Sequence, residues 1–107
     1  MDADIEWIKL RASNGELEAI HDLGALHATF QMGLTNQQSL EKAVEYYSIA
    51  ADKGHPESLY DLAFMYLEGE GTQKDIKQAI KLLKKACEKK HTDACSLLED
   101  IEQGLYD

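Results

Sequence analysis

Four histidines are the residues of this chain best suited to hold a metal ion or to transfer protons. Metal ligands on one helix face are separated by three or four residues, whereas His21 and His27 are six apart. His55 and His91 follow equivalent turns in two distant parts of the chain, and no HExxH or CxxC motif is present. The sequence therefore predicts no metal site.

Two short motifs resemble fragments of catalytic or phosphate-binding sites. Ser39-Leu-Glu-Lys42 fits the Ser-x-x-Lys pattern of a serine nucleophile, but the accompanying SDN and KTG motifs are absent, and we interpret Ser39 as a helix cap. Gly69-Glu-Gly71 has neither the following lysine nor the preceding strand of a phosphate loop. We therefore predict that the chain is not an enzyme, has no catalytic residues and binds no cofactor.

An internal repeat organises the elements that carry these residues. Residues 15–27 align with 54–66 at an offset of 39, and residues 43–50 align with 79–86 at an offset of 36. Shorter matches at both ends indicate half-repeats. We expect a single domain over 1–107, which consists of half-repeat 1–13, repeat 14–53, repeat 54–90 and half-repeat 91–107.

Capping residues set the expected helix boundaries. Each repeat has a first helix, termed helix A, and a second, helix B, so we expect about five helices: a helix B, two full A/B repeats and a final helix A. Pro56 suits a first turn, and Gly69 and Gly71 end the second helix A. The expected N-terminal caps are Ser13 with Glu16 in a capping box, Thr72 with Asp75, and Thr92 with Asp93.

The second repeat resembles the Sel-1-like repeat, a family related to tetratricopeptide repeats. The resemblance is carried by LAFMYLEGEG at 62–71 and by Asp75, Ala79, Leu82-Leu83, Ala86 and Ala94. It implies an all-α fold, a right-handed α-solenoid of antiparallel helix pairs, whose usual role is to hold proteins together. Independently, each pair has an apolar face that only a neighbouring pair can bury, and stacked pairs form a curved surface suited to binding.

In tetratricopeptide-like packing, the residues of helix A outside the core line the concave face. Tyr60 and Phe64, one turn apart, would anchor a partner, unless they pack against a neighbouring helix as aromatic residues at helical spacing often do. The aspartates of this face would receive the partner's cations. The predicted partner-binding residues are Glu18, His21, Asp22, Glu57, Tyr60, Asp61, Phe64, Leu67, Glu68 and Asp100.

The aromatic and aliphatic positions of helix B are expected in the core. Trp7 aligns with Tyr46 and Leu82, and Ile8 aligns with Tyr47 and Leu83. These positions pack helix B on helix A in this kind of repeat. We therefore expect Trp7 and Ile8 to be buried.

The charge distribution favours a basic protein as partner. The chain has 11 Lys and Arg against 20 Asp and Glu, a net charge of -9; residues 74–90 contain seven of the basic residues and two acids, so they carry +5 and the other 90 residues carry -14. Such a chain repels phosphate backbones and anionic lipids, which argues against nucleic acid and membranes, but attracts cationic proteins. The apolar side of the lysine-rich helix is explained by stacking on its neighbours.

A small acidic protein of this kind could be an immunity protein or antitoxin that neutralises a basic toxin through the acidic, aromatic-centred concave face. A general adaptor or regulatory scaffold has the same composition, and its partner would be a regulatory protein. The two terminal half-repeats could also stack between chains to form a homodimer.

Cys87 and Cys95 lie eight residues apart, across the turn between the last two helices. Their spacing resembles that of the cysteine-rich branch of the Sel-1-like repeats, which implies a disulfide. They also align with the core positions Ala51 and Leu59, and the acidic start MDADIEWIKLR is unlike a signal peptide, which favours a cytoplasmic protein with reduced thiols. The alternative is an exported, disulfide-bonded repeat protein with a β-lactam-related hydrolase activity at the Ser39 to Lys42 motif.

Overall fold

The computed structural model describes residues 2–29, 32 and 35–106, which contain six α-helices and no strand. The expected order of a helix B, two A/B pairs and a final helix A is confirmed, but the count of about five was wrong, since that order contains six helices. The helices are α1 (Asp2–Ser13), α2 (Leu17–Ala28), α3 (Asn36–Asp52), α4 (Pro56–Glu68), α5 (Ile76–Glu88) and α6 (Thr92–Glu102).

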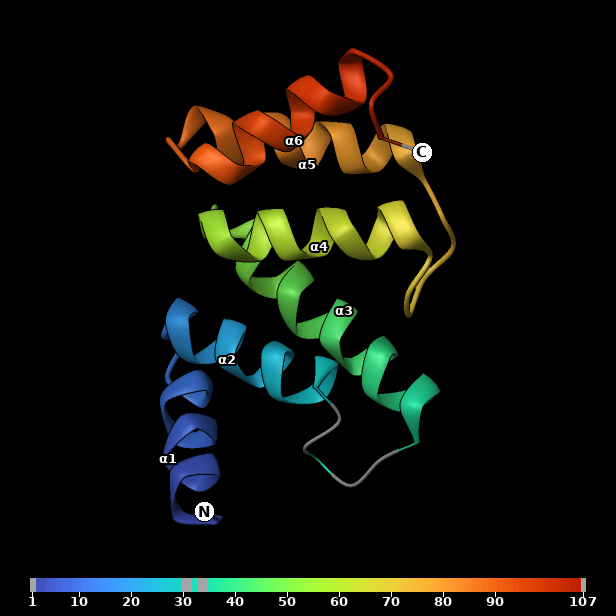
Figure 1. The fold of residues 1–107 in the computed structure, drawn as a ribbon. Coiled ribbons are helices and arrows are strands. Elements are labelled where there is room, and N and C mark those ends of the chain that lie inside the picture. Colours follow the sequence, from blue (N-terminus) through green and yellow to red (C-terminus); the bar gives the residue numbers. More distant parts are fainter. Residues whose placement is uncertain (1, 30–31, 33–34, 107) are drawn as a thin grey trace.

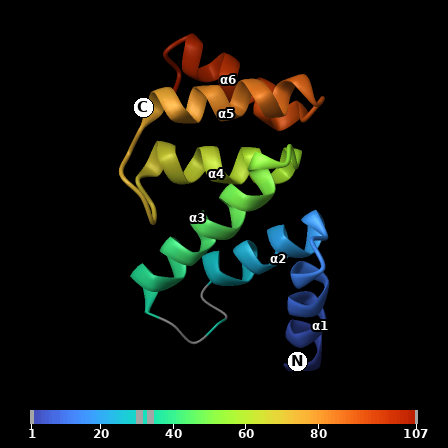
Figure 2. The same ribbon diagram turned by 180° about the vertical axis from the view of Figure 1, so that it is seen from behind.

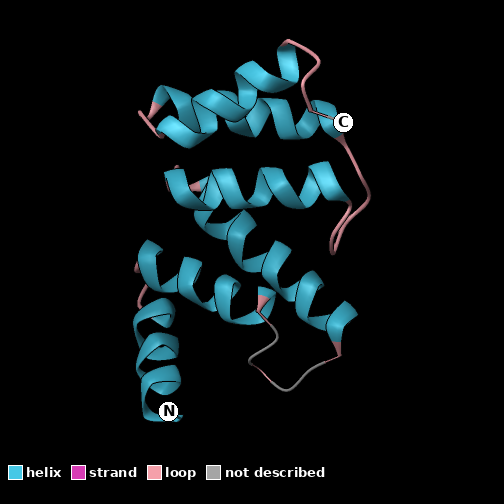
Figure 3. Ribbon diagram, in the orientation of Figure 1, coloured by secondary structure: helices cyan, strands magenta, loops and turns pink. Residues whose placement is uncertain are grey.

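Each helix packs mainly against its neighbours in the sequence, from α1 on α2 to α5 on α6 (Figure 1). The view from behind shows the same succession, with α1 at one end and the α5–α6 pair at the other (Figure 2). Helices and connecting loops alternate along the row (Figure 3), and the molecule measures 45 × 28 × 19 Å. This elongated stack of antiparallel helix pairs is an α-solenoid, as expected.

The lysine-rich helix α5 shows how the sequence pattern becomes packing. Ala79, Leu82, Leu83 and Ala86 recur every three or four residues and are all buried, while the lysines between them are exposed. The predicted stacking face of this helix is thus confirmed for these four residues, whereas Ile76, which was expected on the same face, is 41% exposed. In the described part of the chain, no helix is long and apolar enough to cross a bilayer.

The main core joins α3, α4 and α5 and includes Tyr47, Leu59, Leu62 and Leu83. Trp7 was expected in this kind of environment, but the structure contradicts the prediction, since 58% of Trp7 is exposed. Its equivalents in α3 and α5 pack on the helix A of their own repeat. No such helix lies against α1 on that side in the described residues, so the ring stays at the surface, whereas Ile8 is half-buried.

Three of the expected helix ends are confirmed. Asp75 caps α5 by accepting a hydrogen bond from the Gln78 N–H, Pro56 begins α4, and Gly69 ends α4 in the left-handed conformation at φ 69°. A positive φ suits glycine because it has no Cβ.

Other expected caps were wrong. The N-cap of α2 is Glu16, with Ser13 bonded instead to the Leu10 carbonyl at the end of α1, and the cap of α5 is Asp75 and not Thr72. Thr35 caps α3 in a capping box with Gln38, which leaves Ser39 inside the helix and fully buried. His91 caps α6, so Thr92 and Asp93 lie within its first turn.

Two glycines allow close approaches between elements. A Cβ on Gly24 of α2 would lie 2.7 Å from two ring carbons of Tyr47, so the ring of α3 packs directly on the α2 backbone. A Cβ on Gly71 would lie 2.3 Å from the Leu40 carbonyl oxygen. The loop after α4 therefore lies against α3, and this contact brings Glu70 towards the face described next.

Candidate protein-binding surface

One face of α4 carries the acidic and aromatic residues that the sequence analysis singled out. Glu57, Tyr60, Asp61, Phe64 and Glu68 recur at helical spacing, and we call them the α4 stripe. Glu57 and Glu68 are exposed, whereas the other three are half-buried. The stripe therefore presents carboxylates at its two ends and aromatic rings with a less exposed carboxylate in the middle.

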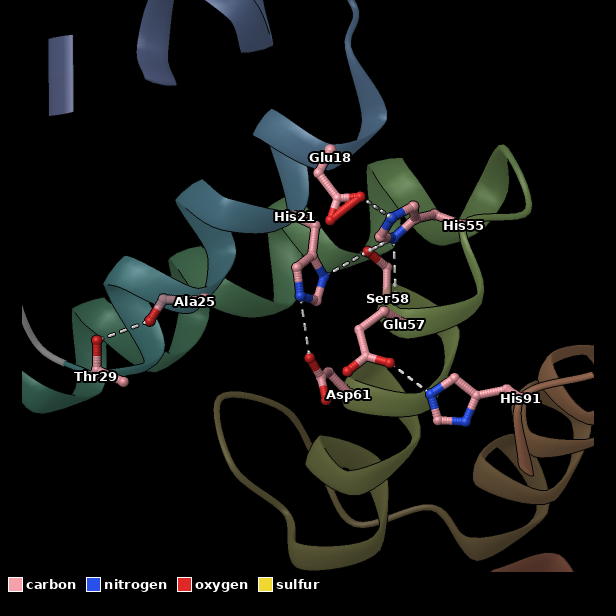
Figure 4. A network of polar contacts seen from close by, with 9 residues as sticks. All are labelled: Glu18, His21, Ala25, Thr29, His55, Glu57, Ser58, Asp61 and His91. Carbon is pink, nitrogen blue, oxygen red and sulfur yellow. Dashed lines mark hydrogen bonds and ion pairs between the residues drawn. The ribbon is translucent and has the colours of Figure 1, made fainter. Parts of the chain in front are cut away.

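The stripe begins at a contact between repeats that occurs twice in the molecule (Figure 4). The Nδ1 atom of His91 accepts a hydrogen bond from the Ala94 N–H and so caps α6, while its Nε2 lies 2.5 Å from a carboxylate oxygen of Glu57. His55 caps α4 in the same way, and its Nε2 lies 3.2 Å from Glu18 of α2. Each histidine thus joins its own helix A to the preceding helix A.

A ring one turn after the glutamate completes each of these contacts. Tyr60 stacks on His91 with ring centroids 4.6 Å apart, and the equivalent His21 lies 5.1 Å from His55. Tyr60 also meets Phe64 edge to face at 5.0 Å, a favoured aromatic geometry. Tyr60 is therefore partly engaged within the protein, while its remaining surface faces outward with Phe64.

A chain of polar contacts runs from α2 into α4 behind the stripe (Figure 4). The Ser58 hydroxyl oxygen lies 2.8 Å from the Nδ1 atoms of both His55 and His21, and His21 Nε2 faces Asp61 Oδ2 at 3.4 Å. Ser58, His21 and Asp61 follow one another in the order of a catalytic triad. Ser58 is fully buried, however, so a substrate has no access to its hydroxyl.

One arrangement of protons is consistent with these contacts when both histidines are neutral and the Ser58 hydroxyl donates to His55. The Nε2 of His55 donates to the Glu18 carboxylate, so its Nδ1 accepts from the Ser58 hydroxyl, and that oxygen in turn accepts from the Nδ1–H of His21. A neutral His21 then turns an acceptor, Nε2, towards Asp61. This arrangement is satisfied when Asp61 is protonated and can donate, and it leaves the ionised carboxylate without a donor from His21.

Burial likewise favours the protonated form of Asp61 and the neutral form of His21. Loss of solvation, reinforced by the charge of Glu57, raises the pKa of Asp61 from 3.8 to about 6. Burial, with a smaller effect of His55, lowers the pKa of His21 and favours its neutral form. Burial also raises the pKa of the Tyr60 hydroxyl. Asp61 is thus the carboxylate of the stripe whose ionisation the fold opposes most clearly.

A hollow of about 330 Å³ opens beside Asp61. The other described residues that line it are Phe64 and Met65 of α4, Ala28 of α2, Leu40 and Tyr47 of α3, and Glu70 of the loop after α4. The walls are mostly apolar, and the two ionisable acids, Asp61 and Glu70, are on the α4 side. The hollow thus combines apolar walls with negative charge.

The remaining predicted binding residues differ in how far they are exposed to solvent. Leu67 was wrong as a binding residue, because only 1% of it is exposed and it belongs to the core. His21 is buried and works inside the polar chain, where 8% of it is exposed. Asp22 is half-buried, whereas Glu18 and Asp100 are exposed on α2 and α6.

Helix periodicity could not reveal two residues of the hollow. Tyr47 comes from a helix B, and Glu70 comes from a turn whose position depends on the approach of Gly71 to α3. The repeat alignment did contain one usable signal: Ser58 aligns at the offset of 39 with Ala19, a small apolar residue, and lies beside Glu57. That departure marks the start of the polar chain.

The Ser39 to Lys42 motif has no catalytic geometry. Ser39 is fully buried and its hydroxyl has no hydrogen-bond partner, whereas Lys42 lies at the surface and pairs with Glu45 at 3.5 Å. Across the described part of the chain, no group of three or more histidine, cysteine, aspartate or glutamate side chains could hold a metal ion.

Cys87 and Cys95 form a disulfide that ties the end of α5 to the start of α6. The sequence analysis favoured reduced thiols, and the structure contradicts that preference. The bond replaces a packing contact, because the aligned residues in the preceding repeat are Ala51 and Leu59, both buried. It bears out the pairing that the resemblance to the cysteine-rich branch implied.

Characterised proteins that resemble the chain are regulatory and assembly factors. It is 36% identical over 78 residues to chitin synthase regulatory factor 3 of Schizosaccharomyces pombe. This alignment covers 73% of this chain and 8% of that protein. It is also 37% identical over 66 residues to human cytochrome c oxidase assembly factor 7. This alignment covers 61% of this chain and 29% of that protein. The chain therefore spans only a small part of these relatives.

Solved structures with the same fold are repeat proteins. A Sel1 repeat protein from Oxalobacter formigenes superimposes with a TM-score of 0.83 at 28% identity, over 92% of this chain and 72% of that one. Cysteine-rich protein B of Helicobacter pylori gives a TM-score of 0.79 at 26% identity, over 88% and 68% of the two chains.

The Sel1 repeat family model matches residues 17–55 and 56–91, which together form most of the chain. The proteins of this family are protein-binding scaffolds that are generally not catalytic. With two matched repeats, a solenoid of helix pairs and structural neighbours of the same kind, this chain belongs to the Sel1 repeat family.

Proposed function

We propose that the chain is a non-enzymatic binding module that takes a basic segment of another protein on the face formed by α2, α4 and α6. The observation that carries the proposal is the α4 stripe, where half-buried aromatic rings lie between carboxylates. Aromatic side chains supply contact area at little entropic cost, and the acids supply charge complementarity.

The distribution of charge supports a cationic partner. Asp22 of α2 and Asp100 of α6 extend the negative charge of the stripe to the neighbouring helices. The whole chain carries a net charge of -9 even though its α5 region is basic. A field of this kind accelerates encounter with a positively charged protein and weakens as the salt concentration rises.

In its sharper form, the proposal is that the partner is a basic toxin and that the chain is its immunity protein or antitoxin. Electrostatic steering onto an acidic face suits a protein that must neutralise a toxin quickly. A regulatory partner in an adaptor complex is the broader form, and the regulatory and assembly roles in the names of the relatives support it.

The absence of catalysis is part of the proposal. The two serines with suggestive neighbours, Ser39 and Ser58, are both fully buried. A nucleophile has to meet its substrate, and neither hydroxyl reaches the surface. We expect Ser39→Ala to leave any β-lactam binding or hydrolysis at the level of the unchanged protein.

A second candidate is an exported protein with the same binding role, and the disulfide favours it. Disulfides persist in oxidising compartments and are rare in the cytosol. Titration of free thiols in denatured protein, isolated from its source cells with alkylation at lysis, separates the two locations. Two reactive thiols support the cytoplasm, and none supports export.

The binding proposal is tested by affinity capture from the lysate and from the secreted fraction of the source cells. The unchanged protein is compared with Tyr60→Ala/Phe64→Ala and, as a matched control, with Tyr46→Ala/Trp7→Ala on the α1–α3 side. Captures at about 50 mM and 500 mM salt test the electrostatic contribution.

We expect a basic protein that the unchanged chain and the control retain, that the stripe variant loses, and that high salt weakens. A captured nuclease or another toxic enzyme that the chain inhibits would support the immunity form. Equal capture by the stripe variant and the unchanged protein would refute the assignment of the binding face.

A further inference from the structure

We propose that the hollow beside Asp61 is a receptor for a single arginine side chain of the partner, with the guanidinium against Phe64 and its N–H groups on the Asp61 and Glu70 carboxylates. The inference rests on the proposed function and deepens it, because it names the group that the acidic face recognises. The occupant follows from the chemistry of the lining.

The shape and lining favour a long side chain with a flat cationic end. The volume of about 330 Å³ exceeds that of a single ion or water molecule, and Tyr47, Phe64 and Met65 provide apolar walls. Such walls suit the methylene stem of arginine, which packs on apolar surface while its charged end finds polar partners. A guanidinium also stacks on aromatic rings.

The charges of the lining select a cation. Among the described residues that line it, Asp61 and Glu70 are the acidic ones, and none is a lysine or an arginine. Carboxylates accept the forked N–H groups of arginine in a planar geometry that lysine does not offer. The two carboxylates would repel an anionic occupant, and a neutral occupant would leave their negative charge uncompensated.

Asp61 has room for an external donor. In the arrangement of protons described above, a neutral His21 turns an acceptor nitrogen towards Asp61 Oδ2 at 3.4 Å. The ionised carboxylate therefore obtains no hydrogen bond from this neighbour. A guanidinium entering from the hollow supplies both the missing donors and the missing positive charge.

The same residue then has opposite effects on stability and binding. The fold disfavours ionised Asp61, because burial and Glu57 raise its pKa to about 6, yet the carboxylate is mostly ionised at pH 7.5. A charge that costs stability in the free protein is typical of a binding site that the ligand completes. Asp61→Asn should therefore stabilise the fold while it removes the receptor.

The test is a titration of the ¹⁵N-labelled protein with N-acetyl-arginine methylamide at pH 7.5, followed by ¹H–¹⁵N spectra. N-acetyl-citrulline methylamide has nearly the same shape without the charge, and N-acetyl-lysine methylamide has the charge without the fork. Asp61→Asn and Phe64→Leu alter the hollow. Asp52→Asn is the control, because Asp52 is an exposed aspartate at the end of α3, outside both the proposed binding face and the lining of the hollow.

We expect the arginine probe to shift the amides of residues around 61–70, with an affinity about tenfold above that of the citrulline probe, the value of one net charged hydrogen bond. Asp61→Asn should abolish this difference, whereas Asp52→Asn should keep it. Equal binding of the arginine and citrulline probes, or equal arginine binding by Asp61→Asn, would overturn the proposal. Shifts spread over acidic residues throughout the surface would do the same.

This outcome can be separated from that of the capture experiment. If a basic protein is captured through the α4 stripe but the arginine probe does not bind in the hollow, the arginine receptor is refuted, whereas the proposed binding face is supported. If the probe binds as expected but the stripe variant captures partners normally, the hollow binds arginine, but the proposed binding face is refuted, and so is the assignment of that arginine to the partner.

Discussion

Replacement of Gly24 by alanine tests the packing of α2 on α3. The new Cβ would lie 2.7 Å from both Cδ1 and Cε1 of Tyr47. Ordinary carbon contacts lie near 3.5 to 4.0 Å, so the ring or the helix must shift by roughly 1 Å. In a helix, alanine is otherwise favoured over glycine by about 1 kcal/mol.

The two effects have opposite signs, and a second substitution separates them. Overpacking costs about 1 to 3 kcal/mol, so we expect Gly24→Ala to lower the free energy of unfolding by about 1 kcal/mol in the unchanged background. The second repeat has Ala63 and Leu83 at the equivalent positions, both fully buried. With Tyr47→Leu the ring is gone, and Gly24→Ala should then stabilise the protein by about 1 kcal/mol.

The assay is urea unfolding followed by helical circular dichroism for the two single variants, the double variant and the unchanged protein. The coupling free energy of the cycle is expected at about 2 kcal/mol. Ala63→Gly measures the cost of glycine at the equivalent helix position. If Gly24→Ala stabilises the protein equally with and without the Tyr47 ring, the close contact between α2 and Tyr47 is not present in solution.

Other predictions concern individual groups. Asp61→Asn should raise the unfolding free energy at pH 8 by about 1 to 2 kcal/mol, a value reduced to allow for the partial exposure of Asp61, and should change it little at pH 4. The reason is that the pKa of Asp61 is raised to about 6, so the stability contributed by its protonated form is lost as the pH rises from about 4 through 6. Equal shifts of the melting temperature at both pH values would contradict this prediction. Ser39→Ala should leave the stability unchanged or raise it by up to about 1 kcal/mol in urea unfolding, because the buried hydroxyl has no partner; a clear loss would reveal a hydrogen bond. Reduction of the disulfide between Cys87 and Cys95 should cost about 2 to 3 kcal/mol by the loop-entropy estimate, measured as a lower unfolding midpoint in reductant, with the Cys87→Ala/Cys95→Ala variant insensitive to reductant as the control. His55→Ala should cost about 1 kcal/mol through the lost cap of α4, and thermal unfolding with no change would contradict the capping role.

The repeat pattern predicted the succession of helices because each apolar face recurs with the same period and must be covered by the next helix. The positions of Leu83 and Ala86 in the core follow directly from that alignment. Trp7 shows where the argument fails: the alignment assigns it the environment of Tyr46, but the environment depends on a neighbouring helix and not on the residue itself. The caps failed for a different reason, since histidine is an uncommon N-cap and serine a common one.

The binding face was predicted less completely than the fold. Helix spacing grouped Glu57, Asp61 and Phe64 on one side of α4. It could not show whether Leu67, at the edge of that group, would be exposed or buried in the core. The hollow depends on a loop, the approach of Gly71 to α3 and a residue of another helix, Tyr47. These are contacts between segments distant in the sequence, and no local pattern encodes them.

The histidine contacts on either side of α4 bear on how such an array can be lengthened. Glu18 contacts His55 and Glu57 contacts His91 through the same pair of residue types at equivalent positions, at 3.2 and 2.5 Å, so the two junctions are built on one plan. A copy of residues 55–90 inserted after Lys90 would bring its own histidine and its own glutamate, but the first Cys87 would then face the copied Leu59, and only the second Cys87 would be placed to pair with Cys95. The first repeat is less suitable for such a duplication, because Gly24 and Tyr47 pack directly on each other and would have to be copied together.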